Sequence, residues 1–172
     1  MKKRIGLIIT IIVAALIVCL LIWRFWPQSS SNLISVDENS ITSFSASAMI
    51  HHLENGQTRT DTYRIDNPAQ QGNEPGDIIE ILATSRYQQD FRNLLPWSAD
   101  NVEADKNYDG RTVVLVSSVG NQKDEWVQIH FLSSSIVTVS VGGEAGFRIY
   151  HPTNNKTLDE LVEYIQTHGV KQ

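Results

Sequence analysis

The stretch DKNYDG, from Asp105 to Gly110, holds the side chains best suited to binding a metal ion. It matches the first half of a calcium-binding loop, in which alternate oxygen ligands converge on the cation and a glycine permits the turn. Asp105, Asn107 and Asp109 would supply the ligands. The position that should hold a bidentate Glu is Val116 instead. An Asx-rich turn explains the same residues, so calcium is one of two interpretations and no other cofactor is expected.

The histidines and serines give no catalytic constellation. His51 and His52 are adjacent on a predicted strand, so they point to opposite faces of the sheet and cannot readily hold one metal. The serines at 133–135 fit a hairpin turn, and no G-x-S-x-G motif occurs. We therefore predict no catalytic residues. An enzyme that combines the acidic loop at 100–110 with a histidine stays open as an alternative.

Two tryptophans are the predicted binding residues. Trp97 follows Pro96 in a predicted loop, and Trp126 lies on the solvent-facing side of a predicted strand. Exposed tryptophan is enriched in the residues that dominate binding energy. Packing beneath the loop at 96–110 is the alternative for both side chains.

The N-terminal segment is apolar throughout. From Ile5 to Trp23 the chain carries no charged residue, and a helix of about 20 such residues spans the hydrocarbon core of a bilayer. The basic residues at 2–4 predict a cytoplasmic N-terminus. Val18 before Cys19 does not fit lipoprotein processing, and no A-x-A-like cleavage site follows. The sequence thus predicts an uncleaved signal-anchor and a single-pass protein of the cell membrane.

These features divide the chain into four parts. The predicted parts are a cytoplasmic N-terminus at 1–4, a transmembrane anchor at 5–23, a juxtamembrane stalk at 24–36 and an extracytoplasmic α+β domain at 37–172. The full chain has 14 basic and 19 acidic residues. Without the four basic residues at 2–4 and 24, the remainder has 10 against 19, a net charge of minus nine. An acidic domain argues against nucleic acid as a partner.

The domain begins with a predicted hairpin. Residues 43–54 and 57–66 meet across Asn55 and Gly56, a favoured pair for a type I′ turn. The two-residue loop sets Glu54 opposite Gln57, and counting back along the strands sets Ala48 opposite Tyr63.

The remaining elements complete the predicted fold class. Apolar spacing predicts a helix over 77–95, and a second helix follows a capping box made by Thr157 and Glu160. Between them, alternation predicts strands at 111–118, 125–132, 136–141 and 147–151. We expect an α+β fold: one N-terminal transmembrane helix, then a two-layer domain of order ββ-α-ββββ-α, with a mostly antiparallel sheet and two helices on one face.

This architecture is similar to that of small single-span proteins on Gram-positive bacterial surfaces, although no family motif accompanies the likeness. We expect a membrane-anchored, non-catalytic binding module of the cell envelope, partnered with an envelope or membrane protein. A calcium or small-ligand sensor acting through a membrane partner is the further alternative.

Overall fold

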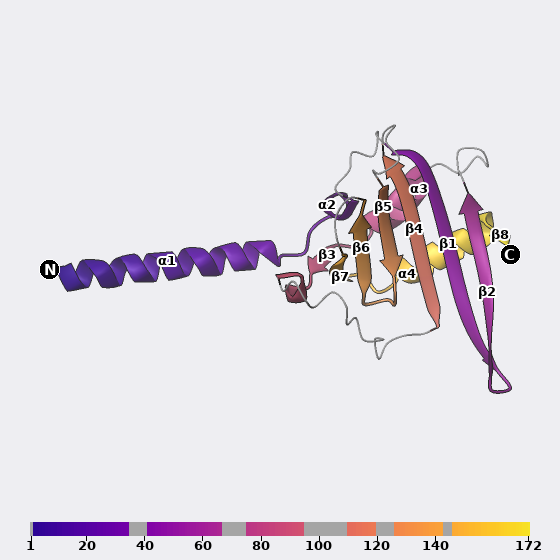
Figure 1. Ribbon diagram of the computed structural model, residues 1–172, viewed down its shortest axis with the longest axis horizontal. Coiled ribbons are helices and arrows are strands. Elements are labelled where there is room, and N and C mark those ends of the chain that lie inside the picture. The colour runs from indigo at the N-terminus through magenta and orange to yellow at the C-terminus, as the bar shows by residue number, and fades with distance from the viewer. Residues whose placement is uncertain (1, 35–40, 67–74, 95–109, 120–125, 143–145) are drawn as a thin grey trace.

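The computed structural model describes residues 2–34, 41–66, 75–94, 110–119, 126–142 and 146–172 (Figure 1). Its helices are α1 (Lys2–Arg24), α2 (Ser30–Ile34), α3 (Pro75–Ala83), the 3₁₀-helix η3 (Phe91–Leu94) and α4 (Thr157–His168). Its strands are β1 (Ile41–Glu54), β2 (Gln57–Asp66), β3 (Tyr87–Gln89), β4 (Arg111–Val119), β5 (Trp126–Phe131), β6 (Val137–Val141), β7 (Arg148–Pro152) and β8 (Val170–Lys171).

The strands form one antiparallel sheet of eight strands in the order β3-β7-β6-β5-β4-β1-β2-β8. The long β1–β2 hairpin reaches beyond the neighbouring strands (Figure 1). Its turn residues have φ of 52° at Asn55 and 77° at Gly56, as a type I′ turn requires. Glu54 pairs with Gln57 and Ala48 with Tyr63, so the predicted register is confirmed.

One face of the sheet packs on the helices and holds the core. Helix α4 contacts β1, β2 and β4, and α3 contacts α4; both lie behind the sheet in Figure 1. On β1 this face presents Ala46 and Ala48, which are 1% and 0% exposed. Small side chains there let the helix approach closely. The apolar stripe of α4 is buried as its spacing predicts: Leu158, Leu161, Val162 and Ile165.

Two local predictions about the helices are wrong. The helix expected over 77–95 ends with α3, where the Thr84 hydroxyl donates to the Ile81 carbonyl at 2.7 Å and competes with the helical pattern. The chain then extends as β3, whose Tyr87 is fully buried and donates its hydroxyl hydrogen bond to Leu82. At α4 no side-chain cap forms, because Thr157 is the first helical residue and its hydroxyl donates to the Asn154 carbonyl.

The predicted fold class therefore needs correction. The order ββ-α-ββββ-α omits β3 and β8, which lie at the two edges of the eight-stranded sheet. It also omits α2, which follows the N-terminal helix directly. Leu33 of α2 is 2% exposed and belongs to the core cluster, and Gln28 bridges to Tyr87. Both residues fall in the segment 24–36, where the sequence suggests a stalk.

The predicted transmembrane anchor at 5–23 is overturned. Among the described residues, no helix is long and apolar enough to cross a membrane. The signal-anchor interpretation and the single-pass location in the cell membrane are therefore wrong as well.

Candidate functional site

The second face of the sheet is the most distinctive surface of the domain. Among the described residues, no helix packs on this face over β1, β4, β5 and β6. None of the side chains that point to it from these four strands, between Ser45 and Ser140, is Asp, Glu, Lys or Arg. We call this set the uncharged face. It consists of Ser45, Ser47, Met49, Thr112, Val114, Val116, Ser118, Trp126, Gln128, His130, Thr138 and Ser140.

The lack of charge on this face departs from the rest of the chain. Charged residues make up 19% of the sequence, so about two of these positions would be charged if composition alone decided. Burial is also even across the face: Thr112 and Thr138 are buried and the others are half-buried. Most of its side chains are small, β-branched or amide, and Trp126 lies at one end of β5.

Strand β5 positions the central residues of the uncharged face. Val127, Ile129 and Phe131 are buried against the helices, and the alternate residues point the other way. This alternation is as predicted. Burial lowers the pKa of His130 below its ordinary value, which favours the neutral ring at physiological pH. A neutral His130 adds no charge to this set of residues; His51 follows Met49 on the same side of β1 but lies outside the set.

Two buried polar atoms lie on the uncharged face without a hydrogen bond. They are Thr112 Oγ1 and His130 Nε2, and neither has a partner within the portion of the chain that the structure describes. An unsatisfied buried polar group costs about 1–3 kcal/mol. Both buried polar atoms that lack a hydrogen bond among the described residues therefore lie on this face of the sheet.

Asp90, Arg92 and His151 form the best-defined ionic network. The Asp90 side chain is 7% exposed and accepts from Arg92 Nη2 at 2.8 Å, and His151 Nε2 lies 2.8 Å from the same oxygen. Burial alone would raise the pKa of Asp90, but the hydrogen bonds from Arg92 and His151 outweigh it and hold that pKa well below its ordinary value.

The geometry of this network favours a structural role over catalysis. His151 Nδ1 lies 2.9 Å from the backbone oxygen of Ser135. Both ring nitrogens are therefore occupied, and neither is free to take a proton from a nucleophile. The Ser133 hydroxyl accepts from the backbone N–H groups of Ser135 and Ile136, each at 3.2 Å. The predicted turn at 133–135 is confirmed.

A second ionic cluster lies where β8 joins the hairpin. Asp61 lies 3.0 Å from Lys171 Nζ, 3.3 Å from Arg59 Nη2 and 3.7 Å from His52 Nε2. The hydrogen bond from Lys171 is the main reason that the pKa of Asp61 is lowered. His51 points to the other face and contacts Thr60 Oγ1 at 2.8 Å, so the two adjacent histidines diverge as the sequence predicts.

Most of the predicted site residues fall outside the described residues. Trp97, Asp105, Asn107 and Asp109 all lie within 95–109, as does most of the acidic loop that an enzyme or calcium sensor would use. Within the described ranges, no group of three or more His, Cys, Asp or Glu side chains could hold a metal ion. Trp126 is the predicted site residue that the structure places, on the uncharged face.

Helix α1 presents a further surface. It extends away from the sheet (Figure 1), and large apolar side chains along it are exposed, among them Leu16, Leu20 and Trp23 at 58%, 63% and 74%. A hollow of about 380 Å³ is lined by Cys19, Ile22, Trp23 and Trp26. Exposed apolar surface of this extent is usually covered by another molecule.

No protein-family model, no curated protein and no solved structure matches this chain. Sequence reasoning missed the uncharged face as a whole, although Trp126, Gln128 and His130 already alternate on the predicted solvent side of one strand. A comparison of the strands would have revealed this face, because the outward positions of all four predicted strands lack charged residues.

Proposed function

We propose that this chain is a non-catalytic protein-binding module, an accessory subunit that docks a partner protein on its uncharged face. The absence of Asp, Glu, Lys and Arg from the twelve positions of this face, contributed by four adjacent strands, carries this proposal. Interface cores are depleted in charged residues, because a charge buried without a partner is strongly unfavourable. A domain with excess acid elsewhere can bury this surface at little electrostatic cost.

The chemistry of the face defines the partner. An uncharged surface of β-branched, aromatic or amide side chains would match it, whereas a charged partner would leave its own charges desolvated and unpaired. Trp126 is the largest side chain on the face and is half-buried. It is the expected hot spot, since tryptophan is the residue type most enriched at such positions.

The Asp90 network supports a binding role over catalysis. Its histidine has no free ring nitrogen, and the hydroxyl of the nearby Ser133 is engaged with backbone N–H groups. The residues with the clearest ionic chemistry thus hold the β5–β6 turn and β7 against the segment that follows β3.

The test is crosslinking of the full-length chain in cells, followed by purification and comparison of three variants. Trp126→Ala removes the expected hot spot, and Val116→Lys places a charge between β1 and β5. Each should weaken capture of one stoichiometric partner by about tenfold or more. Glu163→Lys, on the exposed side of α4, is the matched control and should capture the partner normally.

The folded state of each variant is checked by its thermal melting. Capture that survives both Trp126→Ala and Val116→Lys in folded protein would refute docking on the uncharged face. Capture lost equally in the Glu163→Lys control would show that net charge, and not this face, governs the association.

A further inference from the structure

The outer edge of β2 is only partly covered. Strand β8 pairs with Tyr63 and Arg64, and the backbone N–H of Gln172 donates to the Thr62 carbonyl at 2.9 Å. From Gln57 to Asp61 no strand within the described ranges lies on this side of β2. Residues 57–60 are all exposed. Among the described residues, β2 thus has no neighbouring strand on its outer side along the outer half of the hairpin.

Main-chain groups of β2 point to this side, and the described part of the chain supplies no strand to bond them. Along a strand, the N–H and C=O groups of successive residues point to opposite sides. Because the Thr62 carbonyl points to β8, the peptide groups of Thr60 and Thr58 point the same way. The pairing in the hairpin gives the same alternation. Gln57 pairs with Glu54 next to the two-residue turn, so its N–H and C=O groups point toward β1. An added strand could bond to both threonines.

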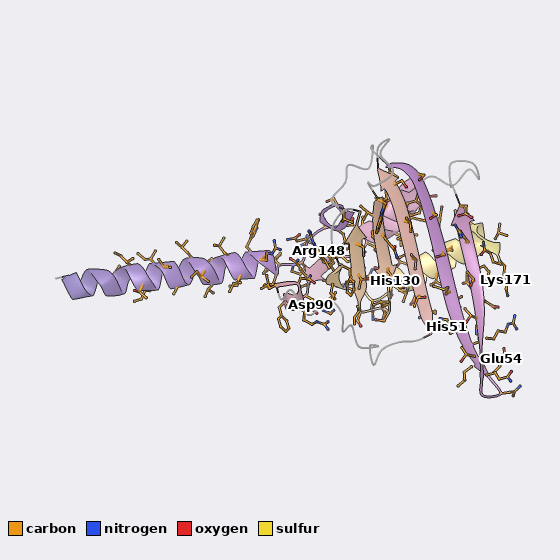
Figure 2. All side chains as sticks on the ribbon, viewed as in Figure 1. His51, Glu54, Asp90, His130, Arg148 and Lys171 are labelled. Carbon is orange, nitrogen blue, oxygen red and sulfur yellow. The ribbon has the colours of Figure 1, made fainter. Side chains whose placement is uncertain are left out.

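The charge beside this edge is positive. Arg59 and Lys171 are 59% and 47% exposed in their side chains, whereas Asp61 between them is 16% exposed. The accessible side chains that pair with Asp61 are therefore cationic, although the chain carries a net charge of minus five. The other groups on this face of the hairpin are His52, 45% exposed and beside Asp61, and Glu54, which lies at the tip opposite Gln57 (Figure 2).

We propose that the edge of β2 from Gln57 to Asp61 binds an extended, acidic segment of a partner protein as an added antiparallel strand. Backbone hydrogen bonds to Thr58 and Thr60 supply the affinity, and an acidic side chain opposite Arg59 supplies the selectivity. A second copy of this chain fits less well, because edge-to-edge pairing would bring two Arg59–Lys171 pairs together. This surface is separate from the uncharged face, so the two proposals stand or fall independently.

The probe is a seven-residue blocked peptide of alternating threonine and valine with glutamate at its centre, added to the full-length chain. Hydrogen exchange followed by NMR should show the Thr58 and Thr60 amides slowed by about tenfold or more at saturation. The same peptide with lysine at its centre should bind about tenfold more weakly. Unchanged exchange at both threonines would overturn the proposal.

Two variants test the two parts of the interaction. Thr60→Pro removes an N–H that points away from β1, a position where an edge strand tolerates proline, and should abolish the slowing at Thr58. Arg59→Glu should reverse the preference between the two peptides, and it keeps the test decisive if the proline variant does not fold. Slowing that persists in folded Thr60→Pro, or that rises with protein concentration without peptide, would contradict strand addition by a partner.

Discussion

At the scale of single residues, several contacts converge on the side chain of Asp90. One oxygen accepts from the backbone N–H of Arg92 at 2.8 Å, and the other is shared by the guanidinium and by His151. Asp90→Asn removes the negative charge and should lower the free energy of unfolding at pH 7 by about 2–3 kcal/mol. Asp159→Asn, which disrupts a pair with Arg111 on a half-exposed carboxylate, should cost less than about 1 kcal/mol.

The Asp90→Asn variant also tests how the free energy of unfolding depends on pH. The folded pKa of Asp90 lies below its ordinary value of 3.8, so the ionised carboxylate contributes stability that is fully present above about pH 4. That stability is lost as the pH falls through the folded pKa. Urea unfolding from pH 7 to pH 2 should therefore show the difference between wild type and Asp90→Asn shrinking below pH 4. A difference that stays constant to pH 2 would show that the carboxylate charge is not the cause.

At the scale of elements, α2 packs against the domain and does not behave as a free linker after α1. Leu33 is 2% exposed within the core cluster, and α2 contacts α3. Leu33→Ala should therefore cost about 2–4 kcal/mol in urea unfolding, by loss of burial and creation of a cavity. Ser31→Ala, on an exposed side chain of the same helix, should change stability by less than about 0.5 kcal/mol. Equal effects of the two substitutions would mean that α2 does not support the core.

The sequence predicted the features that depend on neighbouring residues, namely the hairpin turn and the apolar stripe of α4. The register of the hairpin follows from Asn55 and Gly56 alone, and the stripe of α4 follows from its spacing. The helix predicted over 77–95 was wrong because Tyr87 fits a helical period equally well but is buried in an edge strand beside β7. Edge strands such as β3 and β8 depend on contacts distant in sequence, which periodicity does not report.

The uncharged face could be predicted only in part, for the same reason. Alternation within β5 identified Trp126 as solvent-facing, but the face exists because β1 lies beside β4 and β6 beside β5. The pairing of β1 with β4 joins segments separated by β2, α3 and β3. The order of the strands therefore determines which uncharged positions become neighbours. That order depends on contacts between distant segments, which the pattern within one strand does not report.

At the scale of the whole molecule, the two ends of the structure offer different surfaces to other molecules. The sheet offers a flat, uncharged face and a cationic strand edge, whereas α1 offers apolar side chains on all sides. An accessory subunit that uses both would have two separate contacts with its assembly, and tethering by one contact raises the effective concentration for the other. The apolar surface of α1 is thus expected to be part of the same association.

Cys19 makes this expectation testable, because it is the chain's single cysteine and is exposed beside the hollow lined by Trp23 and Trp26. A maleimide–benzophenone label on Cys19 of the full-length chain should, on illumination in cells, form a covalent bond to one partner protein. The yield should fall about tenfold or more in Trp23→Ala, since a buried indole contributes several kcal/mol to an interface. The control carries the label on Glu163→Cys in a Cys19→Ser background and should not capture that partner. Label recovered on lipid, or spread over the same proteins as the control, would contradict a protein contact at α1.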